Sequence, residues 1–302
     1  MPSGTPLTRG SITALLSPQY RQVYFEAGEE RALEYPLVFH VAPMEWNPLT
    51  DQQVAGLGTQ PTKPEGTQFA TDAMVIGGTV TYTAIPYGLA VEITYESWRD
   101  ELYGALQEMI KGLARAARYR REVQAWACLN NSFTVAGGFD SDYLCTATHT
   151  RTGDAGTSTN RPATDISFSV LGLQAACMSF ETMVNERGLP QVMSPNRVIL
   201  PPQKKWAARE ILGTGSVPYK ADNEINALIA EDLTWMIGHY LTSTTAWWVI
   251  NNQAHDMQYL IRDEDQFDMF DDPRTKNGVA TSYQRMANAG HGAWRGVWGT
   301  TG

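Results

Sequence analysis

Apolar residues recur at helical spacing over residues 97–130. Steps of three and four residues place them on one face of an α-helix, and Ser97, followed by Asp100 and Glu101, is a suitable N-cap. A helix of this length would extend roughly 50 Å, longer than a compact domain of this size requires. We therefore expect part of it to span subunits or to support a projecting segment. The apolar stripe is formed by Trp98, Leu102, Ala105, Leu106, Met109, Leu113, Ala116, Val123 and Trp126.

Strand-like patterns precede this helix. Residues 35–41, 75–83 and 89–94 are mainly apolar or β-branched and predict three strands. Residues 43–73, between the first two, are rich in glycine and proline, and a structureless loop of this length is uncommon in a compact domain. We expect an extended two-stranded loop that projects from the body. A surface loop without fixed structure is the alternative.

The extended loop and the N-terminal segment both have too few apolar residues for a core of their own. Residues 1–34 contain only short apolar groups and predict an arm that lies on something else. An isolated two-stranded hairpin is marginal in water, so Trp46, Val54, Leu57 and Phe69 in the loop are expected to need cover from a neighbouring chain. We expect both segments to gain order by lying across sister molecules.

The second half of the chain mixes helical and strand-like patterns. Residues 130–165 are rich in Gly, Thr and Asp and predict loops around a short apolar island. Residues 167–187 predict a helix that ends at Gly188, and residues 204–212 predict another. Together with the many strands, these helices favour an α+β fold. The strands are predicted at residues 197–200, 228–233, 247–250, 257–261, 267–270, 278–286 and 293–298.

Composition and charge narrow the function. The chain has 302 residues, 43% of them hydrophobic, enough for one domain with extensions or about two domains. A net charge of −9 argues against a reader of nucleic acid, because phosphate binding depends on surplus Lys and Arg. No apolar run approaches the roughly 20 residues that cross a bilayer, and Met1 to Gly10 lack a secretory signal, so we expect a protein made in the cytoplasm without a membrane partner.

Two clusters of charge stand out. Arg115, Arg118, Arg120 and Arg121 lie late in the long predicted helix, where they suit its dipole. They predict a solvated face or salt bridges between subunits, and contact with packaged nucleic acid is the alternative.

An acidic run near the C-terminal end favours a solvated loop over a calcium site, because it lacks the spacing of a calcium loop. This run contains Asp263, Glu264, Asp265, Asp268, Asp271 and Asp272.

Motifs for catalysis or cofactor binding are missing from the sequence. The five histidines are scattered without metal-binding spacing, and no phosphate-binding loop or nucleophile elbow is present. The three cysteines, Cys128, Cys145 and Cys177, form no Cys-x-x-Cys pair and are expected to be buried free thiols. We expect no enzyme activity, no cofactor and no metal site.

Four motifs carry a family resemblance. They are Glu186-Arg187-Gly188-Leu189-Pro190, Pro195-Asn196-Arg197-Val198-Ile199-Leu200-Pro201-Pro202, Trp206-Ala207-Ala208-Arg209-Glu210-Ile211-Leu212 and Trp247-Trp248-Val249-Ile250. Their order resembles the major capsid proteins of tailed bacteriophages with the Hong Kong 97-type fold, especially the branch found in Mu-like heads. Each motif alone is weak, and their shared order over more than half of the chain carries the resemblance.

This resemblance implies an architecture. It places an N-terminal arm at residues 1–34, the extended loop with its flanking strands at 35–92, and a peripheral domain with a spine helix at 93–164. An axial domain follows at 165–255, and strands at 256–302 return to the peripheral domain. The residues expected at contacts between subunits are Trp46, Val54, Leu57, Lys63, Phe69, Arg115, Arg118 and Arg121.

The resemblance also implies a function: a structural head protein of the virion that assembles into pentamers and hexamers of an icosahedral shell around double-stranded DNA, which it touches weakly and without specificity. Implied partners are a separate scaffold protein, a portal and, in some heads, a cement protein. Some related capsids cross-link subunits through a lysine in the extended loop, where Lys63 is the sole candidate. An encapsulin-like nanocompartment subunit and an α+β hydrolase are the alternatives.

Overall fold

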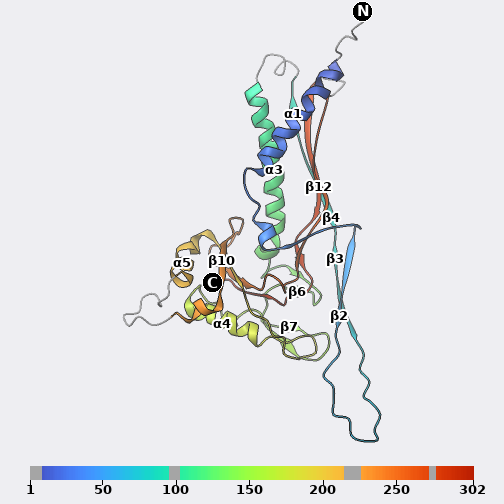
Figure 1. Ribbon diagram of the computed structural model, residues 1–302, viewed down its shortest axis with the longest axis vertical. Coiled ribbons are helices and arrows are strands. Elements are labelled where there is room, and N and C mark those ends of the chain that lie inside the picture. The colour runs from blue at the N-terminus through green and yellow to red at the C-terminus, as the bar shows by residue number, and fades with distance from the viewer. Residues whose placement is uncertain (1–8, 95–102, 214–225, 272–276) are drawn as a thin grey trace, which may run out of the picture.

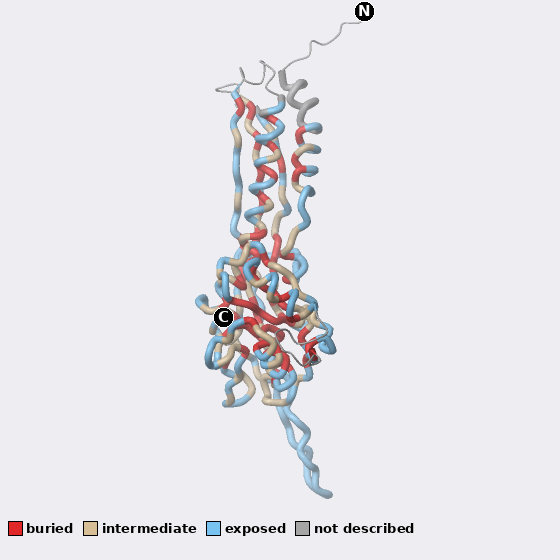
Figure 2. Tube along the Cα trace, turned by 90° about the vertical axis from the view of Figure 1, so that its left-hand side faces the viewer, coloured by how far each residue is buried: buried red, intermediate tan, exposed pale blue. Residues whose placement is uncertain are grey.

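The computed structural model describes residues 9–94, 103–213, 226–271 and 277–302 (Figure 1). The molecule is long and narrow (Figures 1 and 2). An extension of helices and strands forms one end, a body with two smaller helices lies in the middle, and a bare hairpin projects at the other end. The predicted α+β fold is confirmed.

The extension, which we call the spine region, is a two-layer unit. Buried side chains from both layers meet in one apolar cluster. One layer holds the helices α1 (Arg9–Glu29) and α3 (Tyr103–Asn130). The other is an antiparallel ribbon of β4 (Ala84–Ile93), β13 (Gly278–Ala287) and β12 (Met257–Asp271). Two short strands also pair with β12: β1 (His40–Pro43) in parallel and β14 (Gly290–His291) antiparallel.

Helix α3 matches the long predicted helix over its described length. It ends at Asn130, as predicted. Leu106, Leu113 and Trp126 of the predicted apolar stripe are buried, whereas Met109 and Ala116 of the same stripe are exposed. The predicted start at Ser97 lies outside the described residues. The lower end of the helix enters the body, so α3 connects the spine region to the main core (Figure 1).

Helix α1 corrects the picture of the N-terminal arm. The sequence predicted no helix there, yet α1 packs along α3 and β12 of its own chain. Tyr20 and Tyr24, one helical turn apart, are buried; the Tyr24 ring stacks on Phe267 with 4.7 Å between centroids, and its hydroxyl donates to Asp265 (2.5 Å). The expectation that the arm needs a sister molecule for cover is therefore wrong for residues 20–29, because the spine region receives them.

The hairpin at the other end confirms the predicted extended two-stranded loop. Strands β2 (Leu49–Ala55) and β3 (Val75–Tyr82) pair antiparallel and are joined by residues 56–74. We call residues 43–82 the flap. Figure 2 shows its projecting part exposed throughout, whereas the spine region and the body carry buried positions along their length.

The body is built on a four-stranded sheet in the order β10-β9-β11-β15. Strands β9 and β10 are parallel, and the other neighbours are antiparallel. Two helices, α4 (Val170–Glu181) and α5 (Lys205–Leu212), belong to the body. Its strands are β9 (Arg197–Leu200), β10 (Thr234–Ile237), β11 (Trp247–Ile250) and β15 (Val297–Thr300), with small hairpins of β5 (Ala136–Gly137) with β6 (Asp142–Tyr143) and β7 (His149–Thr150) with β8 (Thr157–Ser158).

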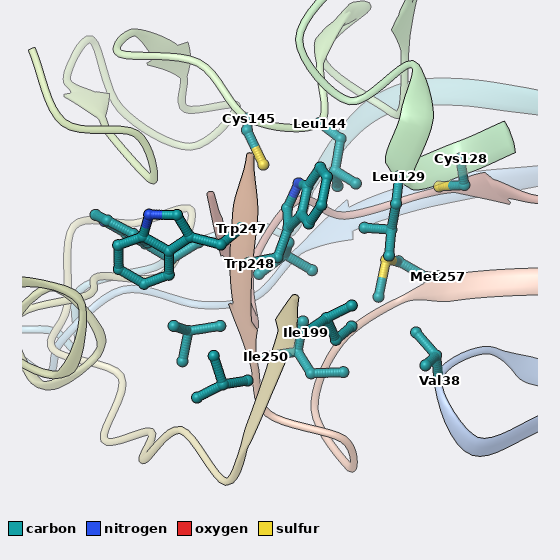
Figure 3. Packing of buried hydrophobic residues seen from close by; sticks show 14 of the residues in the cluster. Val38, Cys128, Leu129, Leu144, Cys145, Ile199, Trp247, Trp248, Ile250 and Met257 are labelled. Carbon is teal, nitrogen blue, oxygen red and sulfur yellow. The ribbon is translucent and has the colours of Figure 1, made fainter. Parts of the chain in front are cut away.

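The core of the body centres on β11, whose four residues are all buried (Figure 3). Both indole N–H groups find acceptors: Trp247 donates to the carbonyl of Ile166 (3.0 Å) and Trp248 to the hydroxyl of Ser132 (3.1 Å). Large rings with satisfied N–H groups fill a core without leaving a buried donor unpaired. The predicted strand at residues 247–250 is confirmed.

Several predicted elements differ from the structure. The strands predicted at 257–261 and 267–270 are one strand, β12, and the strand predicted at 293–298 begins only at Val297, as β15. Residues 228–233 contain part of a 3₁₀ helix, Ala227–Glu231, because the side chain of Asn226 caps it at the Leu228 N–H. Residues 35–41 begin with a 3₁₀ turn that contains a proline in its first positions and reach β1 only at His40. Helix α4 ends at Glu181, six residues before the predicted end, and the Thr182 side chain bonds back to the carbonyl of Met178.

Candidate assembly surfaces

The outer part of the flap carries large apolar side chains that no part of the described chain covers. Val54 and Ile76 are direct neighbours across the two strands and are 55% and 66% exposed. Phe69, in the connecting segment, is 80% exposed, and Trp46 and Leu57 are also exposed. The apolar flap residues that the sequence predicted to lack cover within the chain, Trp46, Val54, Leu57 and Phe69, are therefore all exposed. Exposed apolar side chains are common where proteins associate, and the predicted contact of these residues with a neighbouring chain stays a prediction.

The inner side of the flap lies against the body through close backbone approaches. A side chain at Gly78 would collide with the carbonyl of Phe139, since a β-carbon there would stand 1.9 Å from that oxygen. Beside it, Gln53 donates to Glu186 (2.8 Å) and accepts from the Thr152 hydroxyl (2.8 Å). The flap thus has one anchored side and one bare side.

Glu186 is the centre of this anchoring contact. Its carboxylate accepts from Gln53, from the backbone N–H of Thr152 (2.9 Å) and from the guanidinium of Arg295, and both Glu186 and Arg295 are largely buried. A buried carboxylate with three donors is well compensated for its lost hydration. The sequence flagged Glu186 only as part of a motif. Its role was missed because its partners come from distant parts of the chain.

Lys63 lies on the exposed segment of the flap, and its ammonium group stands 4.8 Å from the ring centre of Phe69. An ammonium group over an aromatic face is a cation–π contact. This geometry groups a basic and an aromatic side chain on the part of the flap farthest from the core. The expectation that Lys63, although the sole candidate in the flap, forms no cross-link between subunits stays a prediction.

The basic cluster on α3 makes contacts inside its own chain. Arg115 pairs with Glu30 (3.0 Å), and Arg118 donates to the carbonyl of Arg31, so both hold the segment that follows α1. Arg121 donates to Gln284 (2.7 Å) and Glu264 (2.8 Å) on the ribbon. Arg115 and Arg118 thus join α3 to the segment that follows α1, and Arg121 joins α3 to the ribbon in the other layer of the spine region. Their predicted part in contacts between subunits stays a prediction.

The acidic run is not the predicted solvated loop but part of strand β12, whose last residue is Asp271; Asp272 lies outside the described residues. Several of its carboxylates bind partners in the fold. Asp265 accepts from Tyr24 and Ser282, and Glu264 pairs with Arg121. Long pairing with β13 overrides the local preference of these residues for a loop.

The described part of the chain holds no group of three or more His, Cys, Asp or Glu side chains arranged to bind a metal ion. Within the same part, none of the helices combines the length and apolar character that spanning a membrane requires. The three cysteines are buried free thiols, as predicted. Burial raises the pKa of Cys128 to about 12 and that of Cys177 to about 11, so these thiols stay protonated near neutral pH and are weak nucleophiles.

The fold is shared with known capsid and shell proteins. A virus-like particle from Pyrococcus furiosus is 5% identical, covering 94% of this chain and 98% of its own, with a TM-score of 0.57. The capsid of cyanophage P-SCSP1u is 10% identical, covering 89% and 88%, with a TM-score of 0.56. A chain of the capsid of bacteriophage JBD30 decorated with minor capsid protein trimers is 14% identical, covering 76% and 99%, with a TM-score of 0.56.

The comparison with curated proteins gives no significant match. A family model for phage capsid proteins matches residues 78–299, well over half of the 302 residues. The match includes β4, α3 and the body up to residue 299, inside β15, and it begins inside β3, so most of the flap lies outside it. Structural resemblance and family match agree on the Hong Kong 97-type fold. The chain therefore belongs to the phage capsid protein family and is a structural subunit of a virion shell, not an enzyme.

Proposed function

We propose that this subunit forms pentamers and hexamers of an icosahedral shell that encloses double-stranded DNA, and that it belongs to the branch found in Mu-like heads. In this proposal residues 93–164 form the peripheral domain, residues 165–255 form the axial domain, and residues 256–302 return to the peripheral domain. The arm at residues 1–34 and the extended loop at residues 35–92 complete the subunit. The encapsulin-like alternative has less support, because the matching family is that of phage capsid proteins.

The observation that carries the proposal is the bare side of the flap. Full burial of a Val, Ile or Phe side chain contributes about 1.5–3 kcal/mol, and the flap leaves Val54, Ile76 and Phe69 more than half exposed. A second copy that covered them would gain this energy at every subunit. A closed shell adds many such modest contacts, so free subunits need no strong pairwise affinity.

A separate scaffold protein, a portal and a cement protein are the proposed partners. Support for a decorating partner comes from the JBD30 capsid, which carries minor capsid protein trimers. Contact with the packaged DNA is expected to be weak, because the chain has a net charge of −9 and its basic cluster is engaged inside the fold.

Electron microscopy of particles formed with the scaffold protein tests the proposal. Wild-type protein is expected to give closed shells of uniform size. A Val54→Ser/Ile76→Ser variant is expected to remain folded and to yield few or no shells. The matched control is Gln60→Ser, which changes an exposed polar residue of the same flap. Wild-type protein that remains a monomer with its scaffold, or double-variant protein that assembles like wild type, would overturn the proposal.

A further inference from the structure

One arginine of the body, Arg187, holds together the two ends of the connecting segment, residues 56–74; we call these two ends the mouth of the flap. The Arg187 guanidinium donates through Nε to the carbonyl of Gly56 (2.8 Å). Its Nη2 donates to the Asp72 carboxylate (2.9 Å) and to the carbonyl of Ala73 (2.6 Å). Gly56 follows β2, and Asp72 and Ala73 precede β3, so a single side chain joins the two ends of residues 56–74.

Asp72 completes this closure from the side of the flap. Its second oxygen accepts from the backbone N–H of Gly58 (2.7 Å), and its first accepts from the N–H of Ala73 (2.8 Å). The N–H donors of Gly58 and Ala73, and then Arg187, lower the pKa of the Asp72 carboxyl. The carboxylate is therefore ionised at neutral pH and bridges the outgoing and returning chain.

The body presents Arg187 on a tight turn. The Asn185 side chain accepts from the backbone N–H groups of Arg187 (2.9 Å) and Leu189 (3.0 Å). Gly188 has φ of +74°, a conformation that suits glycine, and a β-carbon there would stand 2.6 Å from Asp154. Arg187 also donates to the carbonyl of Gly153 (3.3 Å). The guanidinium is thus fixed in position by the body, and its side chain is only 16% exposed.

We propose that Arg187 and Asp72 form a latch that fixes the flap to the body of its own subunit before any partner binds. A free two-stranded hairpin is marginal in water, and ordering a segment during association weakens binding. The latch orders the mouth of the flap in advance, with the bare side of Val54 and Ile76 turned outward. The inference deepens the proposed function, in which a second copy covers that side.

The planar fork of arginine is necessary for this role. Three acceptors from two separated chain segments converge on one guanidinium, which offers several N–H donors in fixed directions. Lysine offers a single ammonium centre and does not reach all three in that arrangement. An Arg187→Lys variant therefore separates the loss of the fork from the loss of positive charge.

Hydrogen exchange on the free subunit, measured without scaffold and at a concentration where it is monomeric, tests the latch. In Arg187→Gln, peptides that cover residues 53–58 and 72–77 are expected to exchange roughly tenfold faster or more, while the peptide over β11 keeps its protection. Arg187→Lys is expected to show most of this increase. The matched control is Arg161→Gln, which removes another arginine–aspartate pair, with Asp165 in the body; its flap is expected to exchange like wild type.

Asp72→Asn keeps the test decisive if the Arg187 variants fail to fold, because Asp72 lies on the exposed flap and its change leaves the body intact. It is expected to accelerate exchange in the same two peptides. Unchanged exchange in Arg187→Gln, or in Asp72→Asn where the arginine variants do not fold, would overturn the latch. A failure of wild-type protein to form shells would count against the proposed function alone, since the exchange experiment contains no shells.

Discussion

The two ends of this molecule differ in whether their apolar side chains are covered by the same chain. The arm helix α1 and the flap both leave the body, but α1 buries Tyr24 against Phe267 and the apolar stripe of α3, whereas the flap leaves Val54 and Phe69 in solvent. A helix that meets a second layer completes a core within the chain. A two-stranded ribbon has no second layer over its outer side, so its apolar side chains remain available to a partner.

The difference extends to the contacts that hold each segment. The arm is held by an apolar cluster together with a few polar bonds. The flap is held at its base by Gln53, Glu186 and the Arg187 latch, while its outer side stays bare. Polar contacts at the base of the flap fix its orientation relative to the body but leave its outer apolar side chains exposed. The comparison predicts that changes in the arm alter the stability of the subunit and changes in the flap alter its assembly.

The largest effect is expected from Tyr24→Ala. It removes a buried ring and its bond to Asp265, and such truncations cost about 3–5 kcal/mol of unfolding free energy. Urea denaturation of the free subunit measures this loss. Tyr24→Phe keeps the ring and is expected to lose only about 1 kcal/mol. A loss below about 1 kcal/mol in Tyr24→Ala would show that α1 is not packed as described.

Acid is expected to destabilise the subunit through two buried histidines. Burial lowers the pKa of His255 and of His291 to about 4. The unfolded chain binds these protons near pH 6.5 and the folded chain does not, so the unfolding free energy falls as pH drops from about 6.5 to about 4. The loss of unfolding free energy is on the order of 1.4 kcal/mol per pH unit for each histidine within this range.

Urea titrations at pH 7 and pH 4.5 measure this dependence, and His291→Gln isolates one of the two contributions. The variant is expected to lose less stability than wild type over the same interval. Glu122, whose pKa is raised by burial, acts in the opposite direction and is present in both proteins, so it cancels in the difference. Equal losses in the two proteins would show that His291 takes up a proton equally well in the folded state.

A small effect is expected from Arg115→Gln, which removes the ion pair with Glu30 where the arm joins the spine region. Both side chains are about half exposed, so water screens the pair and the cost is about 0–1 kcal/mol. The difference from wild type is expected to vanish in high salt. Denaturation curves at low and high salt provide the measurement. A cost above about 2 kcal/mol would make this pair, not the apolar cluster, the main anchor of the arm.

The smallest effect on stability is expected from Phe69→Ala. The ring is 80% exposed, so its loss changes the unfolding free energy by no more than about 0.5 kcal/mol. Shell yield with the scaffold protein is expected to fall in the same variant, because the ring is part of the surface proposed to meet a second copy. Thermal unfolding and particle counts from one preparation measure both quantities. A destabilised but fully assembling variant would reverse the comparison between the two ends.

Local patterns predicted the strongest elements of the fold. The stripe that contains Leu106 and Leu113 gave α3 and its end, and the run Trp247 to Ile250 gave a buried strand. The flap was predicted from the Gly- and Pro-rich composition of its connecting segment. The arm helix was missed because polar residues interrupt its apolar positions, which gives it almost no helical periodicity. The acidic strand was missed because pairing with β13 stabilises it.

Periodicity, glycine and proline act locally, so the amino-acid sequence was enough to predict the α+β fold, the projecting flap and the exposed apolar residues on it. The folded structure was needed to show which side chains cover one another. It placed α1 on its own spine region, engaged Arg115, Arg118 and Arg121 inside the chain, and brought Arg187 to the mouth of the flap. These contacts join residues far apart in the sequence, so no local pattern specifies them.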